Sequence, residues 1–404
     1  MKLKQFIFAF VAMLSLTFSA FAQSVTTQEQ LQEALNGGGN VTLDASITVT
    51  APVTIPSGSE VVLNLNGKTL KATNAKTIVL ENSGNLTING EGTVSGIIYN
   101  GKDDKSTAEM TLNGGTYNLD GNSGGIHHYG KALTINDGVV VKTTSYGVRV
   151  SGKNSVLNLN GGTYTSTGTG DMRRPIAATK GTVNFFDKDI TVNGNMHVMV
   201  GAVKINFGEN NENSPFEAYH QGNSYGSSAF YCTTLQEAID RTGFAAVSLA
   251  KNVKVALDAP IVVNKEIELN LNGHNLSAPA AKNPVLQNFA NLTIEGKGTV
   301  KGAIYNGTSE KKDVAVLTLN GGTYQLDGAN GGIFHYGKTL DINNGVTVKT
   351  AMYGVRVSNK GSVLNVNGGK FVGSSDLFNM QRAIAVDAGT VNFTDSDVDY
   401  TGVL

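Results

Sequence analysis

The chain has 404 residues, a formal net charge of −1, one cysteine and no tryptophan. Its length fits two or three globular domains or one long array of repeats, because a domain usually holds ~100–200 residues. Charged residues make up 16% and glycine accounts for 49 positions, so the composition excludes a coiled coil and a charged disordered tail. The near-zero charge also argues against a nucleic-acid-binding protein.

The first 22 residues have the features of an export signal. Lys2 and Lys4 precede the mostly apolar run 6–18, and the small-x-small triplet 20–22 follows it. The apolar run is shorter than the ~20 residues that a membrane span needs. We expect residues 1–22 to be removed and the remaining chain, without a membrane span, to reach the periplasm, the outer surface or the extracellular medium. A retained N-terminal anchor is the alternative.

Two short helices are predicted, one near the start of each half. The capping-box pattern Thr26-Thr27-Gln28-Glu29 precedes Leu31, Ala34 and Leu35, which fall on one helical face. The pattern recurs at 234–237, before apolar residues with the same helical spacing. We expect each helix to cover the first turn of a stacked structure, whose end needs protection.

A short strand pattern returns through the whole chain in steps of 20 to 27 residues. In Leu63-Asn64-Leu65 the two leucines point to one side of a strand and the asparagine to the other. Repeats of this length indicate leucine-rich repeats or a parallel β-helix. The leucine-rich consensus is incomplete here, and second apolar strands such as 147–150 stand in its place. The sequence therefore predicts an all-β solenoid, a parallel β-helix whose apolar residues stack inside.

Asparagine and glycine mark the corners of the predicted coil, because both accept left-handed or bridging backbone angles. Stacked asparagine side chains can also hydrogen-bond along the axis. The corner asparagines that we expect to stack are Asn66, Asn113, Asn160, Asn272, Asn320 and Asn367.

The second half of the chain duplicates the first. The segment 63–67 recurs 206 residues later as 269–273, and 146–151 recurs 207 residues later as 353–358. We expect two tandem coils, 23–208 and 232–404, joined by a polar linker at 209–231; one continuous coil with a lateral helix is the alternative. The second half stops early in its repeat, which predicts either a homo-oligomer contact or a truncated end near Leu404.

The rhythm of strands and Asn-Gly corners resembles the right-handed parallel β-helix of the pectate-lyase-like superfamily, over nearly all of residues 25–404, and especially secreted members from Gram-negative gut bacteria. The resemblance implies a right-handed coil. The enzymes of this superfamily carry either a set of motifs with acidic active-site residues or an Arg-x-Pro-x-x-Arg motif. Only Asp103-Asp104 matches the acidic sets, and 173–178 lacks the second arginine. The resemblance therefore implies the fold and leaves the activity open, since this fold also occurs in tailspikes and adhesins.

Each predicted turn has a second apolar strand, and we align these strands with one another. The alignment predicts a column of solvent-facing residues made of Ile98, His127, Arg149, Ala177 and Met199. In this column His127 and Arg149 are neighbours, one turn apart. A ring beside an arginine is suited to stacking a sugar and holding an anion, and an ordinary mixed surface is the alternative. The candidate binding residues in the two halves are His127, Arg149, Tyr146, Phe334, Arg356 and Tyr353.

Catalysis is the competing interpretation of the same region. In it His128 is a base, Tyr129 is an acid and Arg149 steadies a carboxylate, or else the Asp103-Asp104 loop carries the chemistry. Strand parity instead places His128 and His335 inside the coil, where buried polar side chains usually hold the backbone. No metal-ligand spacing or cofactor motif occurs, so we expect neither a metal nor a cofactor.

The sequence favours a non-catalytic exported β-helix protein that acts as a rigid binding or adhesion module. The partner that we expect is a glycan or a host or bacterial surface protein. The alternative is a lyase or glycoside hydrolase that acts on an acidic polysaccharide.

Overall fold

The computed structural model describes residues 22–401 except 120–124, 170–172, 223–227, 242, 244, 281, 327–331, 374–381 and 395–397. The expected export signal, apart from its last residue, and the expected contact at Leu404 lie outside the described residues. The chain divides between Pro215 and Phe216 into two compact units, unit 1 and unit 2.

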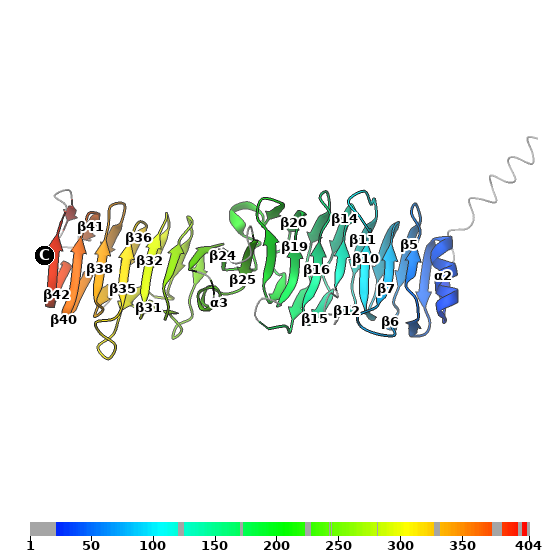
Figure 1. The fold of residues 1–404 in the computed structure, drawn as a ribbon, viewed down its shortest axis with the longest axis horizontal. Coiled ribbons are helices and arrows are strands. Elements are labelled where there is room, and N and C mark those ends of the chain that lie inside the picture. The colour runs from blue at the N-terminus through cyan, green and yellow to red at the C-terminus, as the bar shows by residue number, and fades with distance from the viewer. Residues whose placement is uncertain are drawn as a thin grey trace, which may run out of the picture. The chain divides into compact units, whose positions relative to one another are not determined.

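Unit 1 is a stack of coils in which successive strands enter three parallel sheets in turn (Figure 1). The first sheet contains β1 (Gln23–Val25), β2 (Gly39–Leu43), β5 (Glu60–Asn64), β8 (Asn85–Asn89), β11 (Glu109–Asn113), β14 (Ala132–Ile135), β17 (Val156–Leu159), β20 (Gly181–Phe185) and β23 (Val203–Asn206). The second contains β3 (Ile47–Val49), β6 (Thr69–Ala72), β9 (Thr93–Ser95), β12 (Thr116–Leu119), β15 (Val140–Thr143), β18 (Thr163–Ser166) and β21 (Thr191–Asn193). The third contains β4 (Val53–Ile55), β7 (Ile78–Asn82), β10 (Ile97–Asn100), β13 (Ile126–His128), β16 (Tyr146–Val150), β19 (Arg174–Ala178) and β22 (Met196–Met199).

Unit 2 repeats this arrangement. Its first sheet contains β26 (Ala246–Leu249), β29 (Ile267–Asn270), β32 (Asn291–Glu295), β35 (Val316–Leu319) and β38 (Thr339–Ile342). The second contains β27 (Val253–Lys254), β30 (Asn275–Ser277), β33 (Thr299–Lys301), β36 (Thr323–Leu326), β39 (Thr347–Thr350), β41 (Lys370–Gly373) and β43 (Asp399–Thr401). The third contains β28 (Ile261–Val263), β31 (Pro284–Asn288), β34 (Ala303–Asn306) and β37 (Ile333–His335). Two long strands, β40 (Tyr353–Val366) and β42 (Arg382–Phe393), turn the corner and belong to both the third and the first sheet.

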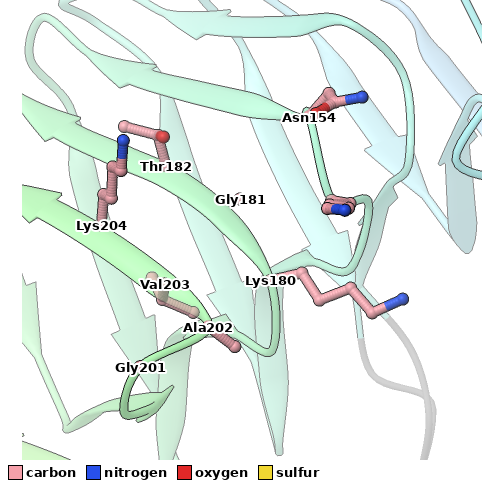
Figure 2. A pocket seen from close by; sticks show the side chains of 9 residues that line it. Asn154, Lys180, Gly181, Thr182, Gly201, Ala202, Val203 and Lys204 are labelled. Atoms are coloured by element: carbon pink, nitrogen blue, oxygen red, sulfur yellow. The ribbon is translucent and has the colours of Figure 1, made fainter.

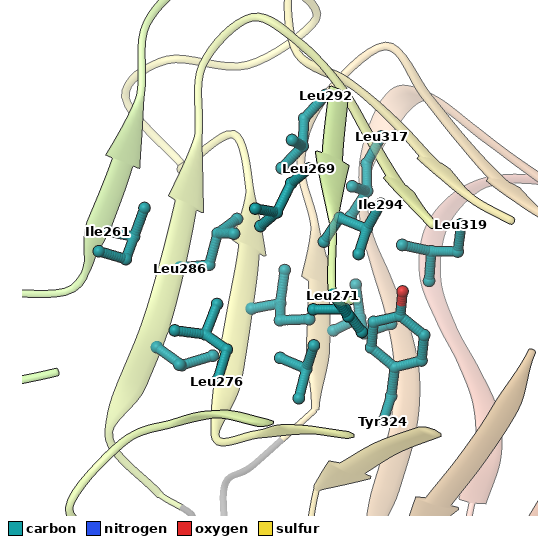
Figure 3. Packing of buried hydrophobic residues seen from close by; sticks show 14 of the residues in the cluster. Ile261, Leu269, Leu271, Leu276, Leu286, Leu292, Ile294, Leu317, Leu319 and Tyr324 are labelled. Carbon is teal, nitrogen blue, oxygen red and sulfur yellow. The ribbon is translucent and has the colours of Figure 1, made fainter. Parts of the chain in front are cut away.

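The interior of each unit consists of apolar side chains stacked turn upon turn. Every second residue of a strand points inward, so the leucines of Leu63-Asn64-Leu65 are buried and Asn64 is not. Figure 3 shows the same arrangement in unit 2, where Leu269, Ile294 and Leu319 lie in one cluster. Each fully buried leucine or isoleucine contributes ~1.5–3 kcal/mol. The predicted parallel β-helix is confirmed.

The corner asparagines take two different roles. Asn66 and Asn272 adopt left-handed angles, with φ of 50° and 51°, and their side chains bond backbone carbonyls instead of each other. A true ladder joins four successive turns of unit 1 through Asn89, Asn113, Asn136 and Asn160, and three turns of unit 2 through Asn320, Asn343 and Asn367. The predicted ladder therefore exists, but Asn66 and Asn272 are not part of it, because their backbone angles turn the side chains toward the preceding turn.

Helix α2 (Gln28–Gly37) packs against the first coil of unit 1 and buries Leu31, Ala34 and Leu35. Its N-cap is Thr27, one residue later than the capping box predicts, and the side chain of Gln30 accepts from the amide of Thr26. Helix α3 (Leu235–Asp240) in unit 2 begins as predicted, with Thr234 as its N-cap. Neither of the α-helices in the described ranges is long and apolar enough to cross a bilayer.

Both helices protect the free edge of the first strand in the third sheet through a glutamine. The amide group of Gln32 donates to the carbonyl of Thr54 (2.9 Å) and accepts from its N–H (2.8 Å). Gln236 makes the same pair of bonds to Val262 (2.9 and 2.8 Å). Each side chain thus takes the place of a neighbouring strand at an edge that would otherwise be open.

The expected polar linker at 209–231 contains regular structure. It begins with the 3₁₀ helix η2 (Glu209–Asn211), and an antiparallel pair follows, β24 (Ala218–Gly222) with β25 (Ser228–Cys232). Aromatic side chains hold the pair together: the rings of Tyr219 and Tyr231 stack at 5.0 Å. The polar composition of the stretch predicts a linker and gives no sign that its aromatic residues pack between two strands.

Candidate functional site

The outer face of the third sheet in unit 1 carries the candidate binding residues. The parallel register places Tyr99 beside His127 and His127 beside Arg149 on successive turns. In unit 2 the same register gives Tyr305, Phe334 and Arg356. The predicted pairing of His127 with Arg149 is therefore present, and so is that of its counterparts.

The predicted column is wrong at both ends. Ile98 is fully buried and pairs with the buried Ile126, so Tyr99 takes the outward position. The reason is a register shift between Ile97 and Ile98, which turns both isoleucines inward. At the other end His197, not Met199, lies beside Ala177.

An aromatic pair occupies two adjacent turns in each unit. The rings of Tyr99 and His127 stack with centroids 4.8 Å apart and planes at 11°. Tyr305 and Phe334 stack at 4.9 Å and 17°. Because the rings face each other, a ligand meets mainly their edges. His127 is only 8% exposed, so it lies on the outer face as expected but offers little surface.

A tyrosine between two arginines stands next to the aromatic pair in unit 1. The guanidinium carbons of Arg149 and Arg174 lie 5.5 and 5.4 Å from the ring centroid of Tyr146. The buried Arg174 also donates from Nη1 to the Tyr146 hydroxyl at 2.7 Å. This bond fixes the tyrosine ring, and the ring in turn supports Arg149 through a cation–π contact.

The matching cluster in unit 2 contains an additional carboxylate. Arg356 and Arg382 lie 5.5 and 5.7 Å from the ring of Tyr353. Arg356 donates from Nε to Oδ2 of Asp387 at 2.6 Å, and the hydroxyl of Ser358 donates to the same oxygen. The bond from Arg356 lowers the pKa of Asp387, and Asp387 raises the pKa of Arg356.

The alternative catalytic base, His128, is part of an interior polar column. Asn82 donates to Oδ1 of Asn100 (2.8 Å), Asn100 donates to Nδ1 of His128 (3.1 Å), and Nε2 of His128 bonds the carbonyl of Val156 (3.1 Å). Since an amide nitrogen only donates, His128 is neutral with its proton on Nε2. Burial lowers the pKa of His128 to about 4. Both ring nitrogens are used and the side chain is fully buried, so the structure gives His128 the role of holding the corner.

Unit 2 repeats the interior column bond for bond. Asn288 donates to Asn306 (2.8 Å), Asn306 to Nδ1 of His335 (3.1 Å), and Nε2 of His335 bonds the carbonyl of Val363 (3.0 Å). Burial also lowers the pKa of His335 to about 4. The interior position predicted for both histidines is confirmed.

The other alternative catalytic residues make hydrogen bonds with backbone groups or form a surface ion pair. Asp103 accepts from the amide of Lys105, within its own loop. Asp104 accepts from the amide of Lys153 (2.9 Å) and pairs with Lys180 (3.3 Å), and these contacts lower its pKa. The backbone N–H of Tyr129 donates to the carbonyl of Asn100. Within the described part of the chain, no hydrogen bond joins the side chains of Asp103, Asp104 or Tyr129 to His128, so these residues do not form a catalytic group there.

A basic depression of about 610 Å³ near the last strands of the first sheet in unit 1 was missed by the sequence analysis (Figure 2). Its cationic side chains are Lys153, Lys180 and Lys204, which come from three successive turns. Figure 2 shows Lys180 and Lys204 pointing in different directions. The lysines are far apart in sequence, so only the register of the coils reveals the group. Among the residues that the structure describes, no three His, Cys, Asp or Glu side chains gather to hold a metal ion.

Comparison with known proteins yields no family. No family model matches the chain, and no curated protein does so. The solved structure "L. reuters 100-23 SRRP" aligns over 96% of both chains at 14% identity and a TM-score of 0.15, which is too low to support an argument. The solenoid fold follows from the strand pairing alone, and membership of the pectate-lyase-like superfamily stays a prediction.

Proposed function

We propose that this chain is an exported, non-catalytic binding module that contacts a glycan through the outer face of its third sheets. The observation that carries the proposal is the repeated surface cluster. Unit 1 presents Tyr99, Tyr146 and Arg149, and unit 2 presents Tyr305, Tyr353 and Arg356, in the same register. Tyrosine edges with adjacent guanidinium groups match the mixed apolar and hydroxylated surface of a sugar.

The roles of the candidate catalytic side chains favour binding over turnover. His128 is closed to solvent, and Asp104 is paired with a lysine. A lyase or hydrolase needs an accessible acid or base near the scissile bond. Arg149 by itself supplies charge and hydrogen-bond donors, which suffice for recognition.

The parallel sheets also support a scaffold role. Each coil is hydrogen-bonded to the coils before and after it within its unit, and the asparagine ladder adds side-chain bonds along the same direction. Residues on successive turns of a unit therefore keep fixed spacings of ~4.8 Å. Such a surface suits a ligand that extends over several turns.

The test uses residues 23–404 against a panel of neutral and acidic oligosaccharides, with calorimetry for binding and a reducing-end assay for cleavage. We expect binding without new reducing ends, weakened by Tyr146→Ala. Phe186→Ala, an exposed aromatic change outside the cluster, is the matched control and leaves binding unchanged. Release of reducing ends by the wild type that Arg149→Ala abolishes would instead establish the enzymatic alternative.

A further inference from the structure

The two outer faces differ in whether their central arginine is paired with a carboxylate. In unit 2 Asp387 occupies the guanidinium group of Arg356 with a 2.6 Å bond. The residue of unit 1 at the position of Asp387 is Thr179, since 387-Asp-Ala-Gly-Thr-Val aligns with 179-Thr-Lys-Gly-Thr-Val. Across the described ranges, no carboxylate forms an ion pair with Arg149.

The surroundings of Arg149 favour an anion. Two guanidinium groups lie within 5.5 Å of the centroid of one tyrosine ring, and Tyr146 is fixed by the buried Arg174. Arg149 is half-buried, so its charge is less screened than that of a fully exposed arginine. A guanidinium group without a partner in such a place is available to a carboxylate, the anion that its planar donors fit best.

We propose that unit 1 binds the carboxylate of an acidic sugar at Arg149, whereas unit 2 fills the corresponding site with its own Asp387. This inference rests on the proposed glycan-binding function and names the ligand class. Asp387 shows where a carboxylate lies in such a cluster, against Nε of the arginine. The edge of Tyr146 beside Arg149, with Tyr99 two turns away on the same face, contacts the hydroxylated ring that carries the acid, which favours a uronic acid over an acidic peptide.

The experiment exchanges the two residues that distinguish the units. The probe is a tetrasaccharide of β-linked glucuronate, and its carboxyl-reduced counterpart, which is neutral, is the ligand control. Thr179→Asp gives Arg149 an internal carboxylate, and Thr179→Val is the control of similar size. Asp387→Thr frees Arg356. Lys204→Gln removes a positive charge from the first sheet of unit 1, whereas Arg149 lies on the third sheet, and so controls for general electrostatic attraction.

We expect the wild type to bind the acidic tetrasaccharide at one site and at least about tenfold more tightly than the reduced one. Thr179→Asp weakens binding about tenfold or more, Thr179→Val and Lys204→Gln change it less than about twofold, and Asp387→Thr creates a second site. Circular dichroism and thermal unfolding verify that each variant is folded.

Each contrary result has a defined meaning. Equal affinity for the acidic and reduced sugars, or unchanged affinity in Thr179→Asp, overturns the inference and leaves the glycan-binding function standing. Binding of an acidic peptide but of neither sugar overturns both in favour of a protein partner. Absence of binding to the whole panel overturns both proposals, and cleavage of the tetrasaccharide overturns only the non-catalytic function.

Discussion

The interior corner and the outer face of the two units have diverged to very different extents. Inside, the column of Asn82, Asn100 and His128 recurs in unit 2 with the same bonds, and the distances agree within 0.1 Å. Outside, His127 of unit 1 corresponds to Phe334 of unit 2, and Thr179 corresponds to Asp387. The interior is constrained because each buried polar group needs its partner. The outer face is free to change, so the differences between the units indicate where their ligands differ.

The largest expected effect on stability comes from a substitution in the interior polar column, which the two units share. Asn100 accepts from Asn82 and donates to His128 and to the carbonyl of Ala132, so Asn100→Ala leaves several buried groups without partners. We expect a loss of about 3–5 kcal/mol in the free energy of unfolding of unit 1, measured by urea denaturation. Asn306→Ala should cost unit 2 a similar amount.

The exposed ladder supplies the control for this comparison. Asn136→Ala also removes side-chain bonds between turns, but at an exposed corner where water replaces them. We expect a loss below about 1 kcal/mol. If Asn100→Ala costs no more than Asn136→Ala, the interior column is not what holds the corner.

The pH dependence of stability is the second way to test the shared interior. Both His128 and His335 have a pKa of about 4 in the folded chain, below the unfolded value of ~6.5. Protonation therefore favours the unfolded state. The stabilisation is complete above pH ~6.5 and is lost as the pH falls from there through about 4, by roughly 3 kcal/mol for each histidine.

Thermal unfolding between pH 7 and pH 4 measures this effect. The double variant His128→Gln with His335→Gln should be less stable at pH 7 but lose less stability on acidification than the wild type does. Parallel stability curves for the two proteins would show that other groups cause the acid sensitivity.

A smaller effect on stability is expected from Gln32 and Gln236, which occupy matching positions in the two units. Gln32→Ala and Gln236→Ala each remove two bonds to the first strand of a third sheet. We expect a loss of about 1–2 kcal/mol in each case, by urea denaturation. Gln32→Glu keeps an acceptor and removes the donor, so it should fall between the wild type and Gln32→Ala. If neither alanine variant changes the free energy of unfolding, water forms the hydrogen bonds of this strand edge equally well.

The smallest effect on stability concerns the outer face. Arg356 and Asp387 are 40% and 49% exposed in their side chains, and such surface pairs contribute ~0–1 kcal/mol. Asp387→Thr should therefore leave the unfolding free energy of unit 2 within about 0.5 kcal/mol while freeing Arg356. A loss above about 2 kcal/mol would assign Asp387 to the stability of the coil.

The sequence predicts the coil well because its signal repeats on every turn. Strand parity also places His128 and His335 inside correctly, since each directly follows an outward residue in its strand. Ile98 is wrongly placed in the outward column because a local register shift at Ile97 and Ile98 leaves no trace in the alternation of apolar and polar residues.

The features that distinguish the units depend on contacts between distant positions. The pairing of Arg356 with Asp387 spans 31 residues, and Gln236 reaches Val262 across 26. No periodic pattern encodes such contacts. A comparison of the duplicated halves at 179 and 387 exposes the charge difference, but only the strand register shows which arginine it affects.

The most direct test removes each arginine in turn. Calorimetric titration of the glucuronate tetrasaccharide into Arg149→Ala and Arg356→Ala compares the two faces in otherwise identical chains. We predict that Arg149→Ala loses about tenfold or more in affinity, whereas Arg356→Ala binds like the wild type. Equal losses in the two variants, or a loss only in Arg356→Ala, would contradict the assignment of the ligand to unit 1.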